Sequence, residues 1–347
     1  MASDLSHDDE IMYHKLKMIF YILSERIRRG EPIPILLSGL LLAFTPVSRL
    51  GMWKRKRRVK VRVPAYVISI GNLTTGGVGK TPAVIARAQE EIQKGSRVAI
   101  LTRGYGSKKT HEPYVVPPGS FKPDMVEWIG DEPALIMRRL PEVGLVKAAD
   151  RVAGAKAAIH QLKCNTLILD DGYQSLYLER DENILLLDAN APFGNGYLLP
   201  RGILREPVAE MKRATEIVLT RCDQCTPEAL ANITTEIKKY VSIPIRYTNH
   251  VPTGLWEPGS GNRYPLDWLA DRPMVALCGI ARPEVFFQTL EMLGVKIVDW
   301  IALPDHGTIS DNMLDREHWI ITTEKDAIRL PAGQWKIMAL IIEIREI

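Results

Sequence analysis

The sequence predicts an α/β fold built on a mainly parallel sheet. Apolar segments of strand length alternate with segments of helical length and periodicity over most of the chain, as in proteins whose parallel strands are joined by helices. A glycine-rich loop lies between an apolar strand and a helix, and another apolar strand ends in two adjacent carboxylates. At 347 residues the chain is long for one domain, which favours two.

In the first part of the chain, strands are expected at residues 66–70, 97–102, 166–170, 184–188 and 216–220. Helices are expected at residues 82–94, 132–140, 150–161 and 226–240. Residues 251–264 are rich in Pro and Gly, which predicts a linker or a loop. A second, smaller α/β unit follows, with a helix at residues 283–293 and strands at residues 274–278, 296–301, 320–323 and 337–344. We therefore expect a domain boundary near residue 243.

The glycine-rich loop, residues 71–82, has the sequence Gly-Asn-Leu-Thr-Thr-Gly-Gly-Val-Gly-Lys-Thr-Pro. Its glycines allow backbone N–H groups to turn toward an anion, and the following helix N-terminus adds a positive dipole end. We expect Lys80 to reach the β- and γ-phosphates of a nucleotide and the Thr81 hydroxyl to bind Mg²⁺. The alternative is an ordinary glycine-rich loop, but the strand–loop–helix order favours a P-loop. The residues expected to bind the nucleotide are Thr74, Thr75, Gly76, Gly77, Val78, Gly79, Lys80 and Thr81.

Carboxylates occur at two further places where they could take part in phosphoryl transfer. The strand at residues 166–170 ends in Asp170 and Asp171, and a P-loop protein holds its Mg²⁺ at such a strand end. Because neighbouring residues of a strand point to opposite faces, one of the two could face the metal and the other orient a loop. Asp131 begins a predicted helix, where it could cap the helix or act as a base on an acceptor hydroxyl.

Several loops have polar residues with two open interpretations. Arg205 could clamp a phosphate with its guanidinium, and the loop that starts at Arg103 lies where ligand-binding loops leave a parallel sheet. His306, beside a carboxylate, could transfer protons near neutral pH. Each of these could instead be a solvated surface residue. Cys222 and Cys225 form an isolated C-x-x-C, which is weak evidence for a metal or redox site.

The N-terminal region combines an apolar segment with a basic cluster. Residues 33–47 carry no charge but are fewer than the ~20 residues that span a bilayer. Residues 53–58, Trp-Lys-Arg-Lys-Arg-Arg, follow soon after and suit an interface with anionic headgroups. A buried helix followed by a solvated charge cluster is the alternative. The net charge of +4 is too small to imply nucleic-acid binding by itself.

Taken in order, these motifs resemble the lipid A tetraacyldisaccharide 4'-kinase family. Thr74 departs from the general pattern G-x-x-x-x-G-K-[ST] but is typical of this family, so the departure supports the resemblance. The segments that carry it cover nearly the whole chain and are residues 71–82, 103–106, 130–133, 170–174, 193–200, 204–207, 278–283, 304–306 and 322–326.

The resemblance implies a P-loop NTPase-like core with a mainly parallel sheet, a second, smaller α/β/α domain and an N-terminal membrane-associated helix. We expect these parts at residues 63–242, 243–347 and 1–62, respectively. The resemblance also implies that Asp131 is the general base, aided by His306, and that Thr81, Asp170 and Asp171 hold Mg²⁺ beside ATP. The residues that it places in the substrate site are Arg103, Tyr105, Glu132, Arg151, Gln174 and Glu206.

The expected function is that of an ATP-dependent lipid kinase, which transfers the γ-phosphate of ATP to the 4'-hydroxyl of a tetraacyldisaccharide 1-phosphate in lipid A biosynthesis. Its expected partners are this acylated glucosamine disaccharide and an anionic membrane surface, at the cytoplasmic face of the bacterial inner membrane. No nucleic acid and no obligate protein partner are expected. The alternative is a membrane-peripheral P-loop ATPase that acts as a switch or metallochaperone and makes no special use of Asp131 and His306.

Overall fold

The computed structural model describes residues 26, 59–280, 282–304, 307, 317–330 and 336–347. Their strands form one sheet in the order β11-β10-β12-β13-β8-β7-β6-β1-β5-β2-β4-β3, with β9 paired to β8. The strands are β1 (Tyr66–Asn72), β2 (Val98–Thr102), β3 (Tyr114–Val116), β4 (Gly144–Lys147), β5 (Thr166–Asp170), β6 (Glu182–Asp188), β7 (Glu216–Thr220), β8 (Ile245–Trp256), β9 (Arg263–Tyr264), β10 (Met274–Cys278), β11 (Ile297–Ala302), β12 (Trp319–Thr323) and β13 (Ile337–Glu346). The α-helices are α4 (Lys80–Gln93), α5 (Val126–Ile129), α6 (Asp131–Arg139), α7 (Arg151–Leu162), α8 (Pro227–Lys238), α9 (Pro283–Met292) and α10 (Glu324–Ala327).

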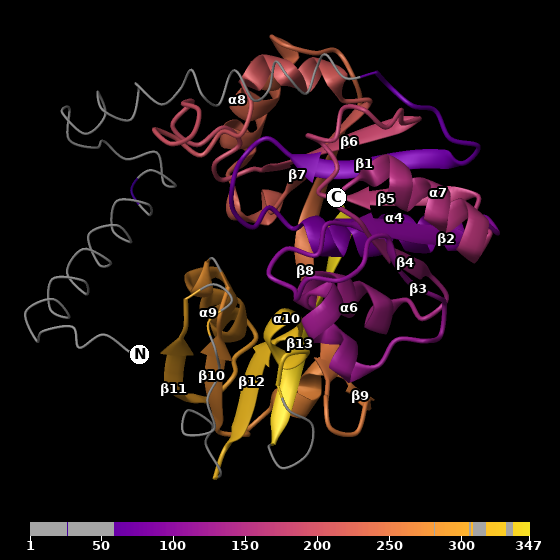
Figure 1. The fold of residues 1–347 in the computed structure, drawn as a ribbon. Coiled ribbons are helices and arrows are strands. Elements are labelled where there is room, and N and C mark those ends of the chain that lie inside the picture. Colours follow the sequence, from indigo (N-terminus) through magenta and orange to yellow (C-terminus); the bar gives the residue numbers. More distant parts are fainter. Residues whose placement is uncertain (1–25, 27–58, 281, 305–306, 308–316, 331–335) are drawn as a thin grey trace, which may run out of the picture.

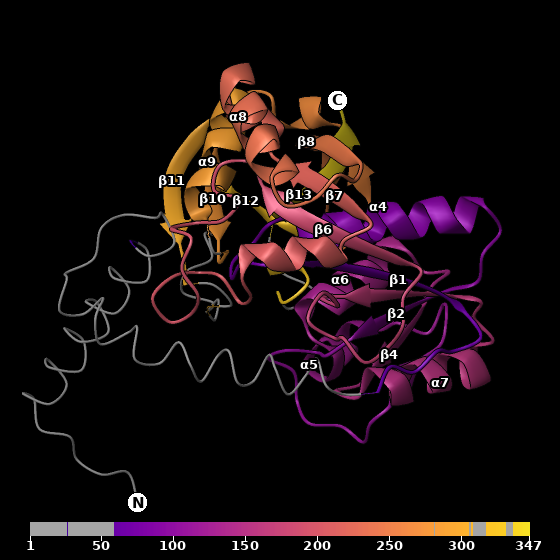
Figure 2. The same cartoon turned by 90° about the horizontal axis from the view of Figure 1, so that it is seen from above.

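The first part of the sheet is parallel around β1, which lies between β5 and β6. Alternate residues of each strand point to opposite faces of the sheet. Because helices cover both faces, the residues on both faces are apolar. On one face, Ile68 and Ile168 pack against Val84 of α4 and Ile136 of α6. On the other face, α7 covers β2, β4 and β5, while α8 covers β6 and β7. Figure 2 shows α4 and α7 on opposite sides of the sheet.

Side chains cap the starts of α7 and α8. The Asp150 side chain accepts hydrogen bonds from the backbone N–H groups of Val152 and Ala153, and α7 begins at the next residue. Thr226 does the same for α8 by accepting from the N–H of Ala229. These side chains satisfy donors that have no partner inside the helix, which stabilises each helix start.

The prediction of a linker or a loop at residues 251–264 was wrong where the chain forms β8 and β9. Residues 251–256 belong to β8, which pairs parallel with β7 at its start and antiparallel with β13 farther on. Pro252 and Gly254 suggested a loop, but the register shifts between Ile341 and Ile342 of β13, so Thr253 is an extra residue. Proline is tolerated in strands at such bulges because no ladder hydrogen bond needs its missing N–H.

The C-terminal part extends the sheet through β8. Strands β10, β11, β12 and β13 pair parallel to one another, with α9 on one face and α10 on the other. Figure 1 shows this part below the first part, with α10 beside α6. The prediction of a mainly parallel α/β core is confirmed. We propose the division into residues 63–242 and 243–347, with β8 crossing from one part to the other.

The predicted membrane-associated helix at residues 33–47 and the basic cluster at residues 53–58 lie outside the described residues. Within the described ranges, every helix is too short or too polar to cross a bilayer.

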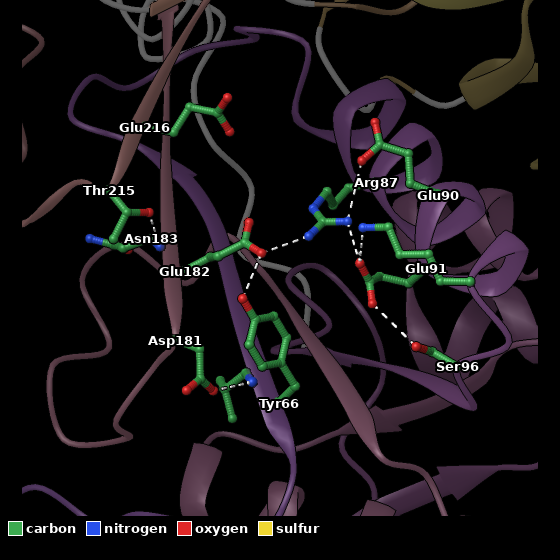
Figure 3. A network of polar contacts seen from close by, with 12 residues as sticks. Tyr66, Arg87, Glu90, Glu91, Ser96, Asp181, Glu182, Asn183, Thr215 and Glu216 are labelled. Carbon is green, nitrogen blue, oxygen red and sulfur yellow. Dashed lines mark hydrogen bonds and ion pairs between the residues drawn. The ribbon is translucent and has the colours of Figure 1, made fainter. Parts of the chain in front are cut away.

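A buried ion-pair network anchors α4 to the sheet, at the end of the helix far from the glycine-rich loop (Figure 3). The guanidinium of Arg87 donates to Glu91 of the same helix (2.5 Å) and to Glu182 of β6 (2.7 Å). The Tyr66 hydroxyl of β1 donates to the same carboxylate of Glu182 (2.9 Å). Arg87 and Glu91 are both buried. The network therefore fixes the position of α4, and with it the loop at its N-terminus.

We expect Arg87→Met to lower the free energy of unfolding by about 3 kcal/mol, because it leaves the buried Glu91 and the half-buried Glu182 without their common cation. Chemical denaturation measures this change. The control is Lys239→Met, which removes an exposed ion pair with Glu236 and is expected to change the free energy of unfolding much less. Equal losses in both variants would contradict the anchoring role.

Candidate active site

A cavity of about 810 Å³ opens where β1, β2 and β5 end. Ligands of parallel α/β sheets bind at such carboxyl edges. The cavity brings together predicted residues from six segments that are separate in the sequence. Its lining residues are Thr75, Lys80, Thr102, Arg103, Tyr105, Asp131, Glu132, Pro133, Ala149, Arg151, Asp170, Asp171, Gln174, Ser175, Tyr177, Leu199 and Arg205.

The glycine-rich loop runs from the end of β1 to the start of α4. Gly79, immediately before α4, has φ +83°, a backbone conformation that favours glycine. A Cβ atom there would also lie 2.4 Å from Nε2 of His250, so only glycine fits. Lys80 is the first residue of α4, and its Nζ lies 3.5 Å from Oδ1 of Asn72. The lysine therefore faces the cavity beside backbone N–H groups of the helix N-terminus, an arrangement that suits phosphate oxygens.

Two residues that the sequence analysis did not predict support this loop from behind. The guanidinium of Arg221 donates to the carbonyl of Gly77 (2.8 Å) and to the carboxylate of Asp188 at the end of β6. Burial, aided by the nearby charge of Arg221, lowers the pKa of His250 to about 3, so its imidazole is neutral. Both residues follow or belong to strands beyond β6, and only their tertiary position relates them to the loop.

Asp170 ends β5 and is buried. Burial and the neighbouring carboxylates of Glu132 and Asp171 raise its pKa to about 7. Its Oδ2 lies 3.5 Å from the Thr102 hydroxyl, while its buried Oδ1 has no hydrogen-bond partner among the described residues. A carboxylate oxygen that is buried, without a hydrogen-bond partner among the described residues and at the edge of this cavity fits a hard cation such as Mg²⁺.

Asp171 has different surroundings from Asp170. Its backbone takes φ +50°, and its carboxylate accepts two hydrogen bonds from Nη1 of Arg205, at 3.0 and 2.8 Å. Burial alone would raise its pKa, but Lys80 and Arg205 outweigh this effect and the pKa is lowered. Asp171 is thus ionised and engaged with a loop arginine. Asp171 is therefore placed to orient the loop that carries Arg205, while the metal-facing role expected of Asp170 stays a prediction.

Arg151 and Gln174 hold the ends of the strands that surround the cavity. The buried guanidinium of Arg151 donates to the backbone carbonyls of Ala148 (2.9 Å) and Asp170 (3.2 Å). The amide of Gln174 donates to the carbonyl of Asn72 (2.9 Å) and its oxygen accepts from Arg205 (3.4 Å). Arg151 therefore places a fixed positive charge beside Asp170.

Asp131 is buried at the start of α6. The N-cap of this helix is Gly130, and Asp131 is the first helical residue, so the capping interpretation does not account for it. Its Oδ1 accepts a hydrogen bond from the N–H of Glu132 (2.9 Å). Asp131 and Lys80 line the same cavity. His306, the predicted partner of Asp131, lies outside the described residues.

The remaining predicted residues divide into two groups. Arg103 donates to the hydroxyl of Tyr105 (2.9 Å), and both line the mouth of the cavity. Glu206 lies elsewhere, contrary to our expectation. It is fully buried and paired with Arg213 (2.5 Å), so it stabilises the loop after Arg205 and is absent from the cavity lining.

Cys222 and Cys225 are free thiols, and burial raises the pKa of both. A raised pKa disfavours the reactive thiolate. In the ranges that the structure describes, no group of three or more His, Cys, Asp or Glu side chains is arranged to hold a metal ion.

The fold and the cavity define a P-loop protein whose phosphate-binding loop, acidic strand end and buried carboxylate surround one ligand site. The model of the tetraacyldisaccharide-1-P 4'-kinase family, LpxK, matches residues 33–346. The chain belongs to this family.

Individual relatives agree with the family match. A protein named tetraacyldisaccharide 4'-kinase from Anaeromyxobacter dehalogenans (strain 2CP-C) is 38% identical over 306 residues, covering 86% of this chain and 81% of its own length. Another with that name, from Pelobacter propionicus, is 37% identical over 333 residues and covers 92% and 90%. The crystal structure of LpxK from Aquifex aeolicus in complex with ATP is similar with a TM-score of 0.74, 32% identity and coverage of 89% and 95%.

The raised pKa of Asp170 predicts a pH dependence of stability in the metal-free protein. Between the ordinary carboxyl pKa and about pH 7, the folded state binds a proton that the unfolded state releases, so stability falls as the pH rises and levels off above pH 7. The slope is on the order of 1 kcal/mol per pH unit. Urea unfolding with chelator at pH 5 to 8 measures it, and Asp170→Asn is expected to remove this slope. Identical pH curves for the native chain and the variant would refute the assignment.

Proposed function

We propose that this chain transfers the γ-phosphoryl group of ATP to the 4'-hydroxyl of a tetraacyldisaccharide 1-phosphate. The observation that carries the proposal is the single cavity shared by Lys80, Asp170 and Asp131. A nucleotide phosphate site, a cation ligand and a candidate base all border it. The family to which the chain belongs, and its relatives' names, specify the lipid acceptor.

Lys80 and the N–H groups of the glycine-rich loop bind the triphosphate of ATP in this proposal. Asp170 and Thr81 would hold Mg²⁺, with Asp171 nearby. When bound, this ion neutralises charge on the β- and γ-phosphates. Arg151 and Arg205 keep fixed positive charges at the cavity, where charge develops as the bond to the leaving oxygen breaks. Thr81 is half-buried in the first turn of α4, next to Lys80.

Asp131 is the proposed general base. The 4'-oxygen forms its bond to the γ-phosphorus, the bond between that phosphorus and the β,γ-bridging oxygen breaks, and ADP leaves. The proton of the hydroxyl passes to the Asp131 carboxylate, and we propose that His306 assists. Arg103, Tyr105, Glu132 and Gln174 border the same cavity and are proposed to position the substrates.

A transfer assay tests this function. γ-Labelled ATP is incubated with a defined tetraacyldisaccharide 1-phosphate in detergent, and labelled lipid is counted. We expect Asp131→Asn to lower kcat by about 10²- to 10⁴-fold with little change in ATP affinity, because only proton removal is lost. Lys80→Ala is expected to lower the rate by about 10²- to 10³-fold and to weaken ATP binding as well.

Asp124→Asn is the matched control, since Asp124 is an exposed carboxylate on the same stretch of chain. Its activity should equal that of the native chain. ATP consumption that needs no lipid, and that Asp131→Asn leaves unchanged, would instead favour the ATPase-switch alternative.

We also propose that the N-terminal region binds the cytoplasmic face of the inner membrane, where the acylated acceptor is found. The support is chemical: the apolar residues 33–47 precede a basic cluster at residues 54–58. An enzyme held at this interface meets its acceptor by diffusion in two dimensions.

Replacing the basic residues 54–58 with Gln is expected to reduce binding to anionic vesicles at least tenfold, because each such side chain contributes about 1 kcal/mol near the surface. Vesicle sedimentation measures binding, and ATP affinity should stay unchanged. The control carries Lys238→Gln and Lys239→Gln, which remove exposed cations from the end of α8. Undiminished sedimentation of the cluster variant would rule out this role.

A further inference from the structure

The contact between α6 and the C-terminal part is lined by opposite charges. At the C-terminal end of α6, Arg138 and Arg139 pair with Glu324 of α10. At its N-terminal end, Glu132 pairs with Lys325 (3.4 Å), and Oδ2 of Asp131 lies 4.0 Å from Nε of Arg329. Figure 1 shows the two helices side by side. One of these contacts thus involves the proposed general base itself.

Arg329 follows α10 and has a side chain that is only 19% exposed. Besides Asp131, its guanidinium has two partners from the C-terminal part. Nη1 donates to the carbonyl of Gly307 (3.2 Å), and Nη2 pairs with the carboxylate of Asp326. Because the guanidinium is planar, these two partners hold its orientation, and Nε faces Asp131.

Asp326 connects Arg329 to the carboxyl edge of the C-terminal strands. It is completely buried and accepts hydrogen bonds from the N–H of Gly279, after β10 (2.9 Å), and from the hydroxyl of Thr323, at the end of β12 (2.7 Å). Gly307 follows β11. The position of the Arg329 guanidinium is therefore set by loops that leave three neighbouring strands, which makes it a rigid element of the C-terminal part.

We infer that Arg329 is a positioning residue for the proposed base Asp131, an inference that rests on the proposed kinase function. The N–H of Glu132 holds Oδ1 of Asp131, and the guanidinium across the boundary faces Oδ2. The hydrogen bond to Oδ1 and the cation that faces Oδ2 together favour one orientation of the Asp131 carboxylate at the cavity. Asp131 is thereby oriented for proton transfer when the C-terminal part is in contact with α6.

The transfer assay with the full chain tests this role through separate kcat, KM for ATP and thermal melting measurements. We expect Arg329→Met to lower kcat at least about tenfold, part of the 10²- to 10⁴-fold that a general base contributes, with the KM for ATP unchanged. Arg329→Lys retains a cation near Asp131 but cannot reproduce the planar contacts. It is expected to recover part of the lost kcat.

Arg138→Met is the matched control, because it removes another cation of the same contact and leaves Glu324 paired with Arg139. Its kcat is expected to stay within about twofold of the native value, even if its melting temperature falls. Equal losses of kcat in Arg138→Met and Arg329→Met would reduce Arg329 to a structural contact and overturn the inference. If the native chain labels no lipid in the parallel reaction, the proposed function itself fails.

Discussion

The arrangement of this molecule depends on the burial of a carboxylate among charged neighbours at the edge of a parallel sheet. Asp170 is excluded from water at the end of β5, with Arg151 behind it and Glu132 and Asp171 nearby. Such a group is costly to ionise unless a cation joins it. The surrounding hydrogen bonds of Arg151, Gln174 and Arg205 do not satisfy its free oxygen but fix the walls around it. The site is therefore built to be completed by a bound cation and an anionic ligand.

The second part of the chain contributes to the same site through two charged connections. One is the contact between α6 and the α10 segment, which ends at Asp131. The other passes from Arg282, before α9, to Asp188 (2.9 Å), then through Arg221 to the carbonyl of Gly77 in the phosphate-binding loop. The C-terminal part is thus connected directly to Asp131, the proposed base, and through Asp188 and Arg221 to the phosphate-binding loop. Strand β8, which pairs with β7 and with β13, makes this junction continuous.

The strengths and the errors of the sequence-based predictions have distinct physical causes. The strands β5, β7 and β10 were predicted with their observed ends, since buried parallel strands are continuous apolar segments bounded by turn residues. β8 was missed because a bulge accommodates its proline, and bulges depend on the partner strand. Glu206 was misplaced because a charged residue next to a site can point away from it when a partner such as Arg213 lies on the other side.

The sequence by itself determined most of the parallel strands, the phosphate loop and the carboxylates at the end of β5, because these depend on local periodicity and on residues at strand ends. The resemblance to a family added Tyr105, Glu132, Arg151 and Gln174, which line the cavity. Tertiary structure alone decided how Asp170 and Asp171 differ, that Arg221 and His250 stand behind the loop, and that Arg329 faces Asp131. The residues in these contacts lie far apart in the chain. Because Coulombic and packing interactions depend on distances in space, a local sequence pattern does not encode them.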